Sequence, residues 1–82
     1  MTDKIAIIID PGHGGAKEKG AIANGFIEKD LNLKVAKLIE SKLSKYFKHL
    51  YMTRESDVEM SLRARGQFVS SKAEKFNGKT IF

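Results

Sequence analysis

The chain has 82 residues, of which 41% are hydrophobic and 30% are charged, and its formal net charge is +5. This balance is typical of one small globular domain, and it excludes a disordered or a membrane-spanning chain. Because the sequence contains no cysteine, disulfides are excluded, and any metal ligand from the protein must be a nitrogen or an oxygen atom.

The basic residues are scattered, apart from one group of lysines in the middle of the chain: Lys34, Lys37, Lys42, Lys45 and Lys48. A nucleic-acid interface would need basic side chains interleaved with aromatic ones on one face. We therefore expect a solvated helix face and no nucleic-acid site, with attraction to an anionic polymer such as bacterial wall material as the alternative. No long apolar stretch follows a basic N-terminal head, so we expect no signal peptide and no membrane span in these residues. Either the protein is made without a signal, or this is a domain cut from a longer precursor.

Residues 4–9 predict a buried strand, because this segment is short, rich in isoleucine and bounded by charged residues and a proline. Apolar residues on both faces favour a central parallel strand with helices on each side. Asp10-Pro11 ends this strand. Residues 11–27 then read as a loop without regular structure, with a turn at Asn24-Gly25, and a loop of that length is usually functional or disordered.

Residues 28–48 predict one long helix, because a single stripe recurs at the helical period: Leu31, Val35, Leu38, Ile39, Leu43, Tyr46 and Phe47. His49 would then end the helix as a partner of its C-terminal dipole. Residues 50–54 predict a second strand, and residues 55–57 a turn.

A second helix is predicted from Ser61, a candidate N-cap, to about Lys75. Residues 79–82 resemble the start of a third strand. The order strand, loop, helix, strand, helix, strand implies an α/β fold, namely a three-layer sandwich with a mostly parallel sheet.

The chemistry of the sequence concentrates on His13 and Glu28. A histidine in a glycine-lined loop after a buried strand lies where open α/β sheets bind ligands. Glu28 opens a helix, where an acid can simply stabilise the dipole. We interpret His13 and Glu28 as two ligands of one metal ion, because a catalytic zinc takes three protein ligands of the His and Glu type. Asp10 either orients His13 through its other ring nitrogen or caps the loop.

Other readings of the polar residues carry less weight. Arg54, Arg63 and Arg65 could fix the loop around Asp57 by ion pairs, but a solvated or structural role is favoured. A phosphate site is disfavoured, because the glycine-rich loop matches neither GxGxxG nor GxxxxGK[ST] and does not open directly into a helix.

Several motifs in order and spacing resemble the zinc-dependent N-acetylmuramoyl-L-alanine amidase family of the Amidase_3 type. They are Ile7-Ile8-Ile9-Asp10-Pro11-Gly12-His13-Gly14-Gly15, Gly20-Ala21, Glu28-Lys29-Asp30-Leu31-Asn32-Leu33, Thr53-Arg54 with Asp57, and Ser61-Leu62 with Arg65. The resemblance covers nearly all of the chain. It implies a peptidoglycan hydrolase, an endolysin or autolysin, that cuts the amide between N-acetylmuramic acid and L-alanine.

The resemblance also implies a zinc cofactor, with His13 as the first ligand and Glu28 as the second. The family's third ligand, a histidine in a Ser-x-His-x-Asn motif, and its catalytic glutamate are absent from this sequence. We therefore expect residues 1–82 to be the N-terminal part of one amidase catalytic domain, a truncated half whose general base would lie beyond Phe82. The complete domain would use zinc to activate water for amide hydrolysis.

Two hypotheses of different class follow. In the first, the chain is of the amidase lineage, acts on peptidoglycan at the extracellular or periplasmic side, and is inactive as an 82-residue fragment. In the second, it is a cell-wall-binding or assembly module that keeps the fold without the chemistry. An open apolar edge would also invite self-association or pairing with a complementary half.

Overall fold

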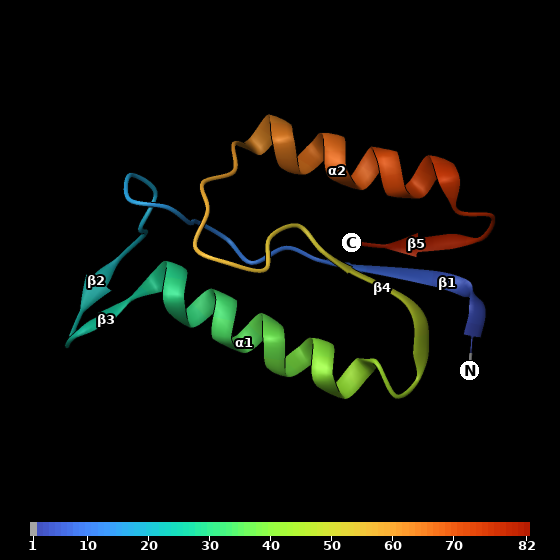
Figure 1. Ribbon diagram of the computed structural model, residues 1–82, viewed down its shortest axis with the longest axis horizontal. Coiled ribbons are helices and arrows are strands. Elements are labelled where there is room, and N and C mark those ends of the chain that lie inside the picture. Colours follow the sequence, from blue (N-terminus) through green and yellow to red (C-terminus); the bar gives the residue numbers. More distant parts are fainter. Residues whose placement is uncertain (1) are drawn as a thin grey trace.

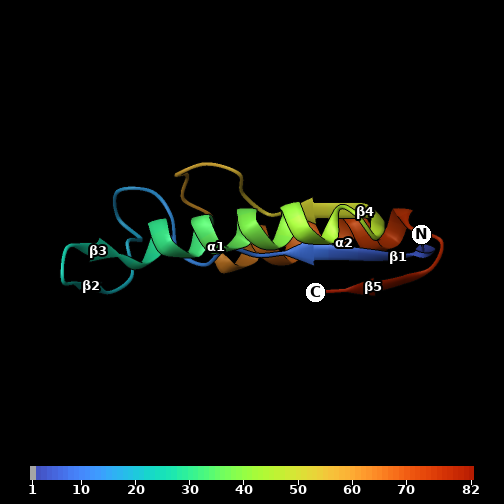
Figure 2. The same cartoon turned by 90° about the horizontal axis from the view of Figure 1, so that it is seen from below.

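The computed structural model describes residues 2–82, which form a small three-stranded sheet with a helix on each face. The elements are β1 (Thr2–Ile9), β2 (Ile22–Ala23), β3 (Phe26–Ile27), α1 (Glu28–Leu43), β4 (Phe47–Met52), α2 (Leu62–Lys75) and β5 (Lys79–Ile81). The sheet order is β4-β1-β5 and both pairings are parallel. The two views together place α1 and α2 on opposite faces (Figure 1, Figure 2). The predicted α/β sandwich with a parallel sheet is therefore confirmed.

The central strand is β1, as its apolar sequence predicted. Ala6 and Ile8 are 0% and 4% exposed, and Ile5, Ile7 and Ile9 on the other face are half-buried. Ile9 pairs with Met52 of β4, and Ile7 with Ile81 of β5. Because the strands are parallel, the ends of β1 and β4 meet at one edge of the sheet, and the polar segments after each strand gather there.

The segment 11–27 is not a structureless loop, and that expectation was wrong for its second half. Ile22–Ala23 and Phe26–Ile27 pair as a two-stranded antiparallel hairpin. Its two-residue turn is Asn24-Gly25, with φ of 53° and 79°, which is the left-handed geometry that hairpin turns require. The turn was predicted correctly, but the strands were too short to show an alternating pattern. The hairpin leads directly into α1.

The predicted end of the long helix was also wrong, because α1 stops at Leu43 and not at residue 48. The amide of Ser44 still donates to the carbonyl of Glu40, and that of Tyr46 to Leu43, which closes the last turn. From Phe47 the chain pairs with β1, so β4 spans Phe47–Met52 where a strand over 50–54 was expected. Parallel pairing with a buried neighbour outweighed the helical spacing of these apolar residues.

His49 therefore lies in a strand, and its expected role at a helix C-terminus was wrong. It sits opposite Ala6 in the β1 register. Its ring meets the ring of Phe76 edge to face, with the centroids 4.8 Å apart. His49 thus packs β4 against Phe76, the C-cap residue of α2.

The second helix follows the prediction closely. Ser61 is its N-cap, and its hydroxyl accepts from the amide of Ala64 at 3.0 Å. The short strand β5 then pairs with β1, in agreement with the third strand expected near 79–82. Neither helix in the described part of the chain has the length and apolar character needed to cross a membrane.

The buried apolar core is small, consisting of Ala6, Ile8, Ala36 and Met52. The face of α1 that is buried carries Lys29 and Ala36. The α1 apolar stripe, which we define as Leu31, Val35, Leu38 and Ile39, stays 41–57% exposed. The chain exposes 5732 Å², against about 4,900 Å² for a compact monomer of its mass. Much apolar surface is therefore left uncovered in the 82-residue chain.

Candidate functional site

The segment that follows β1 holds His13 in an uncommon backbone conformation. Its φ is 60°, in the left-handed region that residues other than glycine seldom adopt. Such backbone persists only where the surrounding structure enforces it, and it is concentrated at functional sites. The imidazole is 35% exposed, so it is accessible from solvent while its backbone is held from within.

His13 and Glu28 converge, as the sequence predicted they would. His13 Nε2 lies 3.3 Å from Glu28 Oε2. The other ring nitrogen, Nδ1, lies 3.9 Å from Glu18 Oε2, which is beyond hydrogen-bond distance. One ring nitrogen therefore faces the carboxylate that opens α1, and the other faces a more exposed carboxylate in the loop. Sequence reasoning had not singled out Glu18.

Ala21, the residue just before the hairpin β2–β3, holds Glu28 through two hydrogen bonds. The amide of Glu28 donates to the carbonyl of Ala21 at 2.8 Å, and the amide of Ala21 donates to Glu28 Oε1 at 2.9 Å. This hydrogen bond, followed by the charge of His13, holds the pKa of Glu28 below its ordinary value. Glu28 is consequently a carboxylate at neutral pH, with Oε1 occupied by the backbone and Oε2 directed to His13.

Gly20 lies directly against this pair. Its φ is +72°, and a Cβ there would lie 2.6 Å from Glu28 Oε1 and 2.7 Å from His13 Cδ2. Both values are far inside normal contact distance. Any side chain at this position would push the imidazole and the carboxylate apart.

Asp10 contacts the site through other residues. Its Oδ1 accepts from Thr53 Oγ1 at 2.6 Å and from Arg65 Nη1. Arg65 in turn donates through Nη2 to the carbonyl of His13 at 2.9 Å. Asp10 therefore ties the end of β1 to α2 and to the backbone of His13, and the predicted orientation of the His13 ring by Asp10 itself stays a prediction.

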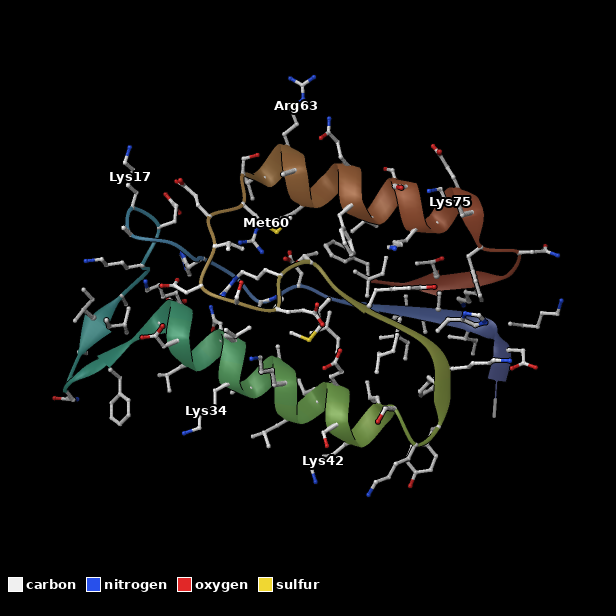
Figure 3. All side chains as sticks on the ribbon, viewed as in Figure 1. Lys17, Lys34, Lys42, Met60, Arg63 and Lys75 are labelled. Atoms are coloured by element: carbon white, nitrogen blue, oxygen red, sulfur yellow. The ribbon has the colours of Figure 1, made fainter. Side chains whose placement is uncertain are left out.

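Two buried arginines, Arg54 and Arg65, bind the loop carbonyls; they are 3% and 7% exposed. Arg54 donates to the carbonyls of Pro11, Gly12, Lys29 and Ser56 at 2.9–3.0 Å. Arg65 donates to Pro11 at 2.8 Å and to His13. Burial, followed by the charge of Arg65, lowers the pKa of Arg54 from its ordinary value. Arg54 and Arg65 are thus structural, as favoured, whereas Arg63 is exposed (Figure 3).

The loop around Asp57 is held by a residue that sequence reasoning missed. Lys29 Nζ donates to Asp57 Oδ2 at 2.7 Å and to the carbonyl of Gly15 at 3.1 Å. The amide of Gly15 donates to the other carboxylate oxygen at 2.8 Å. Both bonds lower the pKa of Asp57. The ion-pair partner of Asp57 is therefore a lysine in the first turn of α1, and a buried lysine beside Glu28 gives no sequence signal of that pairing.

A cleft of about 860 Å³ opens beside His13. It lies between the loop that follows β1 and the start of α2, and its lining includes Asp10, His13, Glu18, Met60 and Arg65. Met60 lies in the segment just before the N-cap of α2, and its side chain points toward the rest of the chain (Figure 3). Within residues 2–82, no group of three or more His, Cys, Asp or Glu side chains is placed to hold a metal ion. The site thus offers two convergent ligand atoms next to a large cleft with a mixed polar and apolar lining.

Comparison with known proteins gives a consistent result. Residues 7–77 match the family described as N-acetylmuramoyl-L-alanine amidase. The chain is 39% identical over 71 residues to the N-acetylmuramoyl-L-alanine amidase LytC of Bacillus subtilis, covering 85% of this chain and 14% of LytC. It is 50% identical over 60 residues to the endolysin of Bacillus phage SPP1, covering 70% of this chain and 22% of the endolysin.

A solved structure has the same fold. The crystal structure of N-acetylmuramoyl-L-alanine amidase from Clostridium difficile 630 matches with a TM-score of 0.81 and 35% identity, over 88% of this chain and 40% of that one. The chain therefore spans less than half of the solved amidase, and a smaller share of the curated relatives.

Proposed function

This chain belongs to the N-acetylmuramoyl-L-alanine amidase family, and on that basis we propose that His13 and Glu28 are two ligands of one zinc ion. The observation that carries the proposal is their convergence from different elements, with Nε2 and Oε2 3.3 Å apart. The family match over residues 7–77 supports it.

The donor pair fits zinc by its chemistry and its spacing. Zinc takes imidazole nitrogen at about 2.0–2.1 Å and carboxylate oxygen at about 2.0–2.2 Å. Two such atoms on a tetrahedral ion lie about 3.3–3.5 Å from each other, and the pair in this chain has that separation. Glu28 is also ionised, because the Ala21 amide lowers its pKa, so it is ready to bind a cation.

When bound, zinc supplies Lewis-acid activation of water for amide hydrolysis. The residues of this chain would hold the zinc ion and orient its ligand atoms. His13 and Glu28 present their ligand atoms, Ala21 occupies the second oxygen of Glu28, and Gly20 leaves room for the two side chains to meet. The cleft beside His13 would receive the substrate.

We propose peptidoglycan as that substrate, and the amide between N-acetylmuramic acid and L-alanine as the bond cut, on the outer or periplasmic side of the cell. The names of the matched amidases support this assignment. The 82-residue polypeptide by itself supplies two ligands, since no larger cluster exists among residues 2–82. We expect it to bind zinc more weakly than a three-ligand site and not to cleave peptidoglycan.

Zinc titration by isothermal calorimetry tests the ligand assignment. The chain contains only two histidines, so His49→Ala is a matched control for His13→Ala. One zinc ion should bind to the chain and to His49→Ala, and binding should be lost in His13→Ala and Glu28→Gln. If zinc does not bind to the unmodified chain, the assignment of His13 and Glu28 as zinc ligands fails. Release of stem peptides from purified peptidoglycan by the 82-residue chain would refute the expected inactivity.

A second candidate function is binding or assembly without catalysis. The observation that favours it is the exposed α1 apolar stripe, because contiguous exposed apolar surface often marks an interaction site. In this case His13→Ala would leave the sedimentation of the chain with purified peptidoglycan unchanged, whereas Leu38→Lys would reduce it. A loss in His13→Ala alone would favour the metal site.

A further inference from the structure

We infer that the two buried arginines, Arg65 and Arg54, are positioning residues for the ligand pair. Arg65 sets the backbone of His13, and Arg54 sets the distance between the His13 loop and the first turn of α1. The inference rests on the proposed zinc site for its consequence, but its structural content concerns metal-free geometry.

Arg65 holds both sides of the turn into His13. Its guanidinium donates to the Asp10 carboxylate, to the carbonyl of Pro11 and to the carbonyl of His13. These three acceptors lie in the four residues that carry the chain from the end of β1 to His13. A planar guanidinium presents its donors in a fixed fork, so it holds these oxygens in one arrangement. This arrangement includes the left-handed φ of 60° at His13.

Arg54 links the two segments that carry the ligands. Its Nη2 donates to the carbonyl of Gly12, next to His13, and to the carbonyl of Lys29, next to Glu28, both at 2.9 Å. A single guanidinium therefore connects the backbone next to His13 with the backbone next to Glu28. A buried guanidinium must keep its hydrogen bonds, because an unpaired buried charge is strongly destabilising.

These contacts indicate positioning beyond simple filling of a core. All the carbonyls bonded to either arginine lie within one residue of a ligand or on the path between β1 and His13, apart from Ser56 and Met60. Lysine would retain the charge but lose the fork. Arg63, on the same helix as Arg65, points away from the sheet (Figure 3), which makes Arg63→Lys a matched control.

The test compares Arg65→Lys and Arg54→Lys with Arg63→Lys in the 82-residue chain. Two metal-free NMR signals report the geometry: the ¹³Cα shift of His13, which depends on its φ, and the NOE between the His13 ring and the Glu28 methylenes. Arg65→Lys should move the ¹³Cα shift of His13 away from its value in the unmodified chain. Arg54→Lys should leave that shift in place and weaken the NOE. Zinc affinity should fall about 10- to 100-fold in both, as it does when residues that orient metal ligands are changed.

Signals in both arginine variants equal to those of Arg63→Lys would overturn the inference, whatever the zinc affinities are. If the unmodified chain binds no zinc, the proposed function fails, and the NMR signals still decide the positioning roles. If Arg65→Lys does not fold, Asp10→Asn tests the same point. It weakens the Arg65 anchor while keeping the shape of the side chain, and an unchanged His13 shift in it would overturn the role of Arg65.

Discussion

Comparing Gly20→Ala with Gly25→Ala should separate the cost of backbone strain from the effect of a new side chain on His13 and Glu28. Gly20 and Gly25 have nearly equal φ values, +72° and +79°. Alanine in the left-handed region costs about 1–2 kcal/mol, so both substitutions should lower the free energy of unfolding by about that amount. The Cβ at Gly25 would meet nothing within 4 Å, whereas at Gly20 it would lie 2.6 Å from Glu28 Oε1 and 2.7 Å from His13 Cδ2.

The steric difference sets the expected magnitude. Carbon and oxygen atoms normally approach to about 3.5 Å, so the two ligand side chains must withdraw by nearly 1 Å in Gly20→Ala. Metal sites tolerate deviations of about 0.2 Å in ligand distance. Gly20→Ala should therefore weaken zinc binding by about tenfold or more, while Gly25→Ala should leave it unchanged.

Urea denaturation measures the shared loss of stability, and isothermal calorimetry measures zinc affinity for the same two proteins. Equal zinc affinities in Gly20→Ala and Gly25→Ala would refute the reasoning, because both positions have a left-handed φ but only the Cβ at Gly20 would meet neighbouring atoms. A tenfold loss in both would instead trace the effect to the backbone.

Three further outcomes are expected. Lys29 and the Gly15 amide lower the pKa of Asp57, so its contribution to stability is present above about pH 4 and is lost as pH falls through the lowered value. Asp57→Asn should therefore be less stable at neutral pH and lose less on acidification. Thermal denaturation across this range checks it, and identical pH profiles would contradict it. Ser61→Ala removes the N-cap of α2 and should cost about 1 kcal/mol in urea denaturation, with no change in zinc affinity. Leu38→Lys places a charge in the α1 apolar stripe and should reduce any concentration-dependent association seen by sedimentation velocity.

The fold was predictable where the pattern was long and strongly periodic. The isoleucine run gave β1, and the Ser61 cap gave the start of α2. The end of α1 was not predictable, because residues 46 and 47 continue the helical spacing. Phe47 instead pairs with β1, which lies about 40 residues away in sequence. The hairpin β2–β3 was missed because each of its strands has only two residues.

The site was predictable in its ligands but not in its supports. His13 and Glu28 were chosen from residue type and position, and they do meet. The individual partners of the arginines, Lys29 and Ala21 were not foreseen, because the arginines bond mainly to main-chain carbonyls, Lys29 to a carboxylate 28 residues away, and Ala21 through its main-chain amide. Sequence patterns record which side chains are apolar or charged, and they do not record which carbonyl a guanidinium will reach.

Most of the bonds made by Arg54 and Arg65 end on main-chain carbonyls, those of Pro11, Gly12, His13 and Lys29 among them. Every amino acid has such an oxygen, so replacing a neighbouring side chain removes no acceptor. Natural variation in the loop should therefore be tolerated wherever the backbone path is preserved. The two arginines have no such freedom, and evolution can reshape the rim of the cleft around them while the geometry at its centre is inherited unchanged.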